Sequence, residues 1–161
     1  MRVFFRNRVT AQPSGQGFTL VEMIAAMTIM MLLTTVALPV ATVAVRREKE
    51  LELRRDLRTM RNAIDRYKDF SDRQMIPMQM DTFGYPPTLK ILVEGVPLKG
   101  SKTRYKFLRK IPVDPMTGNK DWGMRSMQDS PDSESWGGQD VFNVFSKSSG
   151  IGMNGIPYAD W

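Results

Sequence analysis

Few side chains in this chain of 161 residues are suited to catalysis. It has no cysteine and no histidine, which excludes disulfides, thiolate metal sites and cysteine nucleophiles and removes the commonest general base. Five carboxylates fall in its turn-rich part, at Asp114, Asp121, Asp129, Asp132 and Glu134. Acids in such segments are solvated by default, and the alternative interpretation of an exported, membrane-anchored enzyme rests on them. We predict that the chain is not an enzyme.

The most unusual carboxylate is Glu22, which lies directly before a long apolar segment. Residues 23–45 contain 23 uncharged side chains in succession. As a helix they span about 35 Å, enough to cross a hydrocarbon core of about 30 Å. An acid at the edge of a bilayer carries an insertion cost of up to about 3 kcal/mol, and less near the interface. We therefore expect a compensating interaction for Glu22.

The residues before this segment are basic and set the expected orientation. Arg2, Arg6 and Arg8 come without any acid, so the positive-inside rule keeps the N-terminus cytoplasmic and exports the C-terminal part. They also contribute half of the net charge of +6, and nucleic acid is therefore not an expected partner. A cleaved signal peptide has an apolar region of only about 7–15 residues, although residues 42–44 would serve as its cleavage site. A plain signal anchor is the simpler alternative.

We expect one helix to continue past the apolar segment. Strong helix formers follow Val45 as far as Tyr67, and apolar residues at spacings of 4, 3, 4 and 3 form a stripe along one face. The stripe consists of Leu53, Leu57, Met60, Ile64 and Tyr67. Glu50 and Arg54 are spaced as an i,i+4 ion pair, and Arg46 is expected beside lipid headgroups. The predicted helix has roughly 50 residues, apolar all round in its first half and amphipathic in its second.

Pro39 interrupts the apolar segment. Proline lacks the backbone N–H and leaves the carbonyl of Thr35 without its usual partner, so we predict a kink or a loosening of the helix there. The hydroxyls of Thr34 and Thr35 are candidates to compensate locally. A tolerated membrane proline without a functional role is the alternative.

The remaining residues predict a small mixed domain. A turn at residues 85–88 leads into a short helix at residues 89–94. Strands are expected at residues 105–108, 122–127 and 140–146. The C-terminal loop, residues 148–161, is rich in Gly and Ser but retains four large apolar residues, which predict a packed irregular segment. These are Ile151, Ile156, Tyr158 and Trp161.

The run Gly17-Phe18-Thr19-Leu20-Val21-Glu22 before a long apolar segment resembles the class III signal of type IV pilins and of type II secretion pseudopilins. The resemblance implies that a prepilin peptidase cuts between Gly17 and Phe18 and methylates the new amine of Phe18. It also implies that Glu22 of an incoming subunit pairs with the Phe18 amine of its neighbour in a filament. In the alternative, Glu22 is a carboxylate favoured by its own helix N-terminus and wetted by the interface.

Later segments look like those of G-type major pseudopilins, at residues 85–89, 111–118, 121–123 and 140–146. The resemblance implies an α+β fold, in which a long N-terminal helix packs on a small C-terminal antiparallel β-sheet. It divides the chain into a removed leader (1–17), a membrane-spanning and filament-core helix (18–45) and an exported globular domain (46–161). Members of this family often hold calcium in the C-terminal loop, for which Asn154 and Asp160 are the candidate ligands here. A packed loop closed by Trp161 without an ion is the alternative.

These features predict the structural subunit of a pseudopilus that drives type II protein secretion. Its expected partners are further copies of itself, prepilin peptidase, the inner-membrane assembly platform and minor pseudopilins, with membrane lipid around the span before assembly. The expected location is the bacterial inner membrane, crossed once with the C-terminal domain in the periplasm, and then the pseudopilus. The alternatives within the family are a type IV pilin of a surface fibre, for adhesion, motility or DNA uptake, and a minor pseudopilin at the filament tip.

Overall fold

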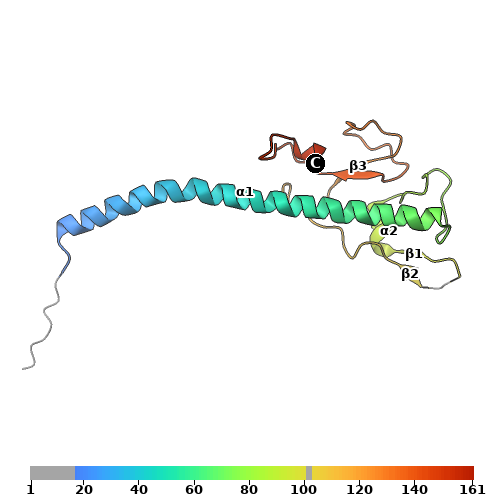
Figure 1. Cartoon of the computed structure of the whole chain (residues 1–161), viewed down its shortest axis with the longest axis horizontal. Coiled ribbons are helices and arrows are strands. Elements are labelled where there is room, and N and C mark those ends of the chain that lie inside the picture. Colours follow the sequence, from blue (N-terminus) through green and yellow to red (C-terminus); the bar gives the residue numbers. More distant parts are fainter. Residues whose placement is uncertain (1–16, 101–102) are drawn as a thin grey trace, which may run out of the picture. The chain divides into compact units, whose positions relative to one another are not determined.

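The computed structural model describes residues 17–100 and 103–161, so the leader expected at residues 1–17 lies outside the described residues except for Gly17. The chain divides into two compact units, Met1–Thr42 and Val43–Trp161. Helix α1 (Leu20–Asp72) supplies the described helical part of the first unit and the first element of the second (Figure 1). We describe the two units separately.

In the first unit, α1 carries apolar side chains that contact no core. Among the described residues, α1 is the helix long and apolar enough to cross a membrane, and none of its apolar window is buried. The helix continues through Pro39. The hydroxyls of Thr34 and Thr35 donate to the carbonyls of Met30 and Met31, at 2.7 and 2.9 Å, so they bond to the turn before and not to the carbonyl of Thr35. A kink at Pro39 stays a prediction.

In the second unit, the predicted stripe of α1 forms the centre of the core. Its five residues are at most 5 % exposed, which confirms the periodicity. The side chains that cover the stripe come from every later part of the chain. They include Leu92, Trp122, Val141, Val144 and Tyr158, each no more than 4 % exposed. The amphipathic half of α1 therefore organises the whole unit.

The later elements are short. They are α2 (Leu89–Glu94), β1 (Val96–Pro97), β2 (Arg104–Tyr105), β3 (Gly123–Arg125), β4 (Asn143–Phe145) and the 3-10 helix η1 (Tyr158–Asp160). Strands β1 and β2 form one antiparallel pair and β3 and β4 another, with Met124 opposite Val144. The α+β fold class is thus confirmed, with the small β region divided into two sheets of two strands.

The strand expected at residues 105–108 is wrong beyond Tyr105. The N–H groups of Phe107 and Leu108 both donate to the carbonyl of Leu92 at 2.9 Å, so these residues cap α2 and pair with no strand. The other two predicted strands contain β3 and β4 but are longer than them. Gly123 in β3 has no room for a side chain, because a Cβ there would lie 2.3 Å from the Phe145 ring.

Candidate functional site

The predicted cleavage site lies immediately before α1. Gly17, Phe18 and Thr19 are non-helical and exposed, and α1 begins at Leu20. The Phe18 side chain is 81 % exposed, and no atom lies within 4 Å of the position that a Cβ on Gly17 would take. The peptide bond between Gly17 and Phe18 is therefore exposed and outside the helix, as access by a protease requires.

Glu22 closes a capping box with Thr19 at the start of α1. The Glu22 Oε2 atom accepts hydrogen bonds from the Thr19 backbone N–H and from the Thr19 hydroxyl, both at 3.1 Å. In return, the Thr19 Oγ1 atom accepts the Glu22 backbone N–H at 3.2 Å. This reciprocal pattern satisfies two of the backbone donors that a helix N-terminus leaves without partners. The other carboxylate oxygen, Oε1, accepts no hydrogen bond from the described residues.

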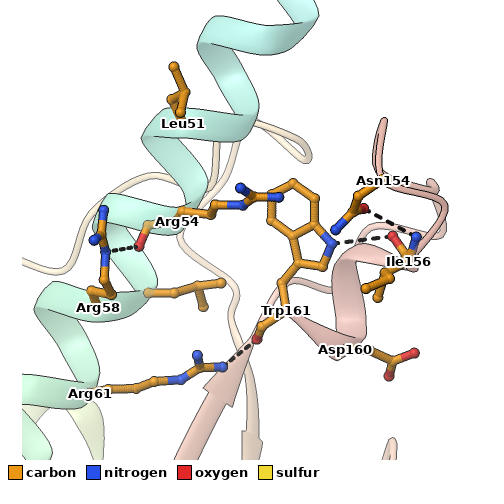
Figure 2. Close-up of a pocket in the computed structure, with 9 residues that line it drawn as sticks. Leu51, Arg54, Arg58, Arg61, Asn154, Ile156, Asp160 and Trp161 are labelled. Atoms are coloured by element: carbon orange, nitrogen blue, oxygen red, sulfur yellow. Dashed lines mark hydrogen bonds between the residues drawn. The ribbon is translucent and has the colours of Figure 1, made fainter.

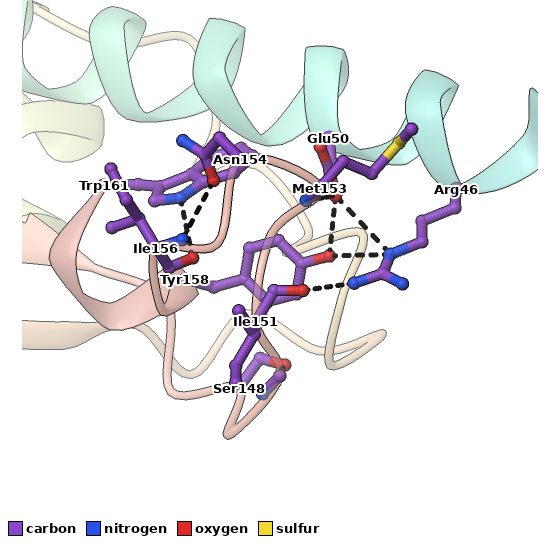
Figure 3. A network of polar contacts seen from close by, with 10 residues as sticks. Arg46, Glu50, Ser148, Ile151, Met153, Asn154, Ile156, Tyr158 and Trp161 are labelled. Carbon is purple, nitrogen blue, oxygen red and sulfur yellow. Dashed lines mark hydrogen bonds and ion pairs between the residues drawn. The ribbon is translucent and has the colours of Figure 1, made fainter. Parts of the chain in front are cut away.

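A polar network fastens the C-terminal loop to α1 at the beginning of the second unit (Figure 3). Glu50 is only 6 % exposed, and its Oε1 atom accepts the Met153 backbone N–H at 2.9 Å and the Tyr158 hydroxyl at 3.0 Å. The Arg46 guanidinium lies 3.5 Å from the same oxygen and donates to the carbonyl of Ile151. A buried carboxylate thus holds two donors of the loop, and a half-exposed cation balances its charge.

This network corrects one expectation for α1. Glu50 pairs with Arg46, one turn before it, and not with Arg54, one turn after it. Arg54 instead places its guanidinium 4.2 Å from the ring centroid of Trp161. Arg46 also contacts the protein's own loop, and its position beside lipid headgroups stays a prediction. The prediction of a packed C-terminal loop is confirmed for Tyr158, which belongs to the core, and for Trp161, which packs against it, whereas Ile151 and Ile156 are exposed.

The candidate calcium ligands line a basic pocket of about 490 Å³ (Figure 2). Asn154 and Asp160 share this arginine pocket with Arg54, Arg58 and Arg61. The Asn154 Oδ1 atom already accepts the Ile156 backbone N–H at 3.2 Å. One carboxylate beside three guanidinium groups does not fit an ion that prefers several negatively charged oxygen ligands. No cluster of three candidate metal ligands occurs in the described part of the chain, and calcium stays an untested prediction.

The five carboxylates considered for catalysis lie in different surroundings. Asp114 is fully buried, not solvated as expected, and accepts the Met116 N–H and the Ser146 hydroxyl, at 2.8 and 2.6 Å. Asp121 forms an exposed ion pair with Lys147. Hydrogen bonds from the backbone N–H groups of Ser126 and Gly137 lower the pKa of Asp129. The last two, Asp132 and Glu134, are exposed. The structure assembles no acid–base pair from these side chains.

A further buried acid, Asp140, was not among the candidates. Its Oδ1 atom accepts the Met127 backbone N–H at 3.0 Å, whereas Oδ2 is buried and has no hydrogen-bond partner among the described residues. Burial raises the pKa of this carboxyl, and the nearby charge of Asp129 acts in the same direction. Asp140 follows the turn that joins β3 to β4, where its backbone carbonyl accepts the Ser126 hydroxyl and the Trp136 indole N–H.

Sequence reasoning missed Thr19 and the partners of Glu50. Thr19 was detectable, because Thr-x-x-Glu before an apolar run is the sequence pattern of a capping box. The contacts of Glu50 could not be detected in the sequence, because they depend on how residues 151–158 fold back onto α1.

The comparisons with known proteins agree with the N-terminal features. Residues 14–38 match the model of the prokaryotic N-terminal methylation motif, which indicates a type IV pilin-like prepilin processed by a peptidase. Together with the apolar helix, the motif indicates a membrane-anchored protein. The comparisons with curated proteins and with solved structures gave no match.

Proposed function

We propose that this prepilin is the structural subunit of a pseudopilus that drives type II protein secretion. The observation that carries the proposal is the methylation motif at residues 14–38, which continues into a helix whose apolar window has no buried part. Such a helix requires lipid or other apolar helices around it, and further copies of the chain supply them in a filament. The likeness of residues 111–118 and 140–146 to G-type pseudopilins favours secretion over a surface fibre.

Processing is the first step in this proposal. Prepilin peptidase cuts between Gly17 and Phe18 on the cytoplasmic side and methylates the new amine of Phe18. The exposure of both residues before the start of α1 supports access to this bond. The methylated amine keeps its positive charge, so cleavage creates a cation four residues from Glu22. The C-terminal domain lies in the periplasm, and no catalytic residue of this chain is needed.

Assembly follows from the charge created by the cut. Before assembly, Glu22 is held by Thr19 through Oε2, which leaves Oε1 able to accept a further donor. We place the Phe18 amine of the neighbouring subunit at this oxygen. Among apolar helices an unpaired charge is costly, so a partner of opposite sign at a single register sets both recruitment and axial stagger. Repetition of one head-to-tail contact then gives an open helical filament.

The variant Glu22→Gln tests this step, because glutamine retains the capping box but removes the charge. We expect the variant to insert and to be processed, and to form no filament. The matched control is Thr19→Ala, which weakens the cap by about 1 kcal/mol and keeps the charge. It should still assemble. Filaments of Glu22→Gln at the normal level would contradict the proposed pairing.

Two further measurements address processing and the type of filament. Intact-mass and N-terminal analysis of the membrane-extracted protein should find a chain that begins at methylated Phe18, and one that begins at Met1 or Val45 would refute the processing. Deletion of the chain in its host should stop the export of secreted proteins. Abundant sheared surface fibres with unchanged secretion would instead identify a surface pilin.

A further inference from the structure

The arginine pocket concentrates positive charge, with three guanidinium groups and one carboxylate side chain among its lining residues. Arg54, Arg58 and Arg61 lie on one face of α1 and line the pocket together with Trp161 (Figure 2). Asp160 is the carboxylate among the lining residues, and its side chain points away from the arginines in Figure 2. The ion pairs of the described residues include none of these three guanidinium groups.

The three arginines differ in what they can still bind. Arg61 already donates from its Nε atom to the Asn143 side chain and from one terminal nitrogen to the main-chain oxygens of Val144 and Trp161. Burial, and then the nearby charge of Arg125, lower the pKa of Arg61, whereas the charge of Asp65 acts in the opposite direction. Arg54 lies over the Trp161 ring.

Arg58 is the pocket arginine whose side-chain hydrogen bond stays within α1, since Arg54 lies over the Trp161 ring and Arg61 bonds to residues outside the helix. It is exposed, and its Nε atom donates to the carbonyl of Arg54 at 3.2 Å within the same helix. Its terminal amino groups donate to no described residue. A guanidinium in this state suits a carboxylate that arrives from outside, since the two groups match in charge and in planar geometry.

The same unit carries a loop with the opposite charge. The acidic loop, residues 129–135, is held in shape by Asp129, which accepts the Ser126 and Gly137 N–H groups at 2.7 and 3.0 Å. Arg125 also fixes it, through a hydrogen bond to the Ser133 carbonyl at 2.7 Å. Asp132 and Glu134 remain exposed, and neither has a hydrogen bond or an ion pair with a described residue. A preorganised loop with unpaired carboxylates has little entropy to lose on binding.

We propose that the arginine pocket of one copy of this chain receives the acidic loop of a neighbouring copy. Arg58 pairs with Glu134, and Arg54 and Asp132 add to the attraction. This inference rests on the proposed function, because a filament brings copies of the chain together in one repeated arrangement. Each copy offers both a pocket and a loop, so a head-to-tail contact can repeat from copy to copy, and it gives an open filament when the rotation between copies does not close a ring. It is a second assembly contact, in the exported domain, separate from the one at Glu22.

Charge reversal in the full chain, expressed in its host with the assembly machinery, tests the pairing. We expect Arg58→Glu and Glu134→Arg each to lower the filament yield by about tenfold, since each replaces an attraction by a repulsion. The double variant should restore the yield. Arg55→Glu is the matched control, because Arg55 is exposed on the same helix and does not line the pocket. A double variant no better than the single variants would overturn the pairing.

Cross-linking gives an independent readout, because the chain has no cysteine of its own. A chain with both Arg58→Cys and Glu134→Cys should form a disulfide-linked ladder of dimers, trimers and larger species under oxidation. A product that stops at the dimer would overturn the head-to-tail contact, and a cross-link to an exported protein would assign the pocket to cargo instead. If the parent chain forms filaments but the double-cysteine chain gives no ladder, only this inference fails. If the parent chain forms no filament, the proposed function fails with it.

Discussion

Replacing Glu50 with Gln tests how the C-terminal loop is held to α1. Glutamine keeps the size of the side chain and one acceptor oxygen, but it removes the charge. In the structure, Glu50 Oε1 accepts the Met153 N–H at 2.9 Å and the Tyr158 hydroxyl at 3.0 Å. Hydrogen bonds to charged groups contribute about 1.5–3 kcal/mol and neutral ones about 0.5–1.5 kcal/mol, so each bond weakens by about 1 kcal/mol.

The ion pair with Arg46 adds a smaller amount. Its Nε atom is 3.5 Å from Glu50 Oε1, and the Arg46 side chain is 51 % exposed, so its loss costs less than about 1 kcal/mol. We therefore expect Glu50→Gln to lower the free energy of unfolding by about 2–3 kcal/mol. For a domain of this size the melting temperature should fall by about 10 °C.

The assay is thermal and urea unfolding of the full chain in detergent, followed by tryptophan fluorescence. Glu48→Gln is the matched control, because Glu48 is exposed on the same helix and has no hydrogen bond or ion pair with a described residue. It removes the same charge at almost the same place. If Glu50→Gln unfolds within about 0.5 kcal/mol of Glu48→Gln, the network does not stabilise the loop and the reasoning is refuted.

Two further predictions concern Asp140 and calcium. A carboxyl whose pKa is higher in the folded than in the unfolded chain stabilises the fold as the pH falls through the folded value, because the folded state takes up the proton first. The free energy of unfolding of the parent, relative to that of Asp140→Asn, should therefore rise as the pH is lowered from 7 to about 4 in urea titrations. A difference between the two chains that does not depend on pH would contradict the raised pKa of Asp140. Calcium or a chelator should leave the melting temperature unchanged, since the arginine pocket does not suit a dication. A calcium-dependent rise that disappears in Asp160→Ala would instead establish the site.

The features that follow from regular spacing were predictable from the sequence. The stripe from Leu53 to Tyr67 was found because an amphipathic helix repeats every 3.6 residues, whatever it packs against. The cleavage signal and the apolar span could be recognised in the sequence for a similar reason, since each is defined by residues that are adjacent in the chain. The pairing of β1 with β2 was not predicted, because strands of two residues carry no pattern of alternation.

The polar contacts were predictable only where both partners lie close in sequence. Thr19 and Glu22 are three residues apart, and their motif contains the whole interaction. Glu50 had a sequence neighbour of opposite charge on either side, at Arg46 and at Arg54, and spacing alone favoured the wrong one. The choice between them depends on the C-terminal loop, which brings Tyr158 to Glu50 and Trp161 to Arg54.

The contacts of Glu50 also fix when the second unit can finish folding. They join residues 103 and 108 positions apart in the chain. Closing so long a loop costs conformational entropy before any contact offsets it, which makes such contacts late events in folding. Synthesis delivers Met153 and Tyr158 long after α1. The beginning of the second unit therefore waits for its last residues, and a chain whose synthesis halts before them presents an unfinished surface along α1.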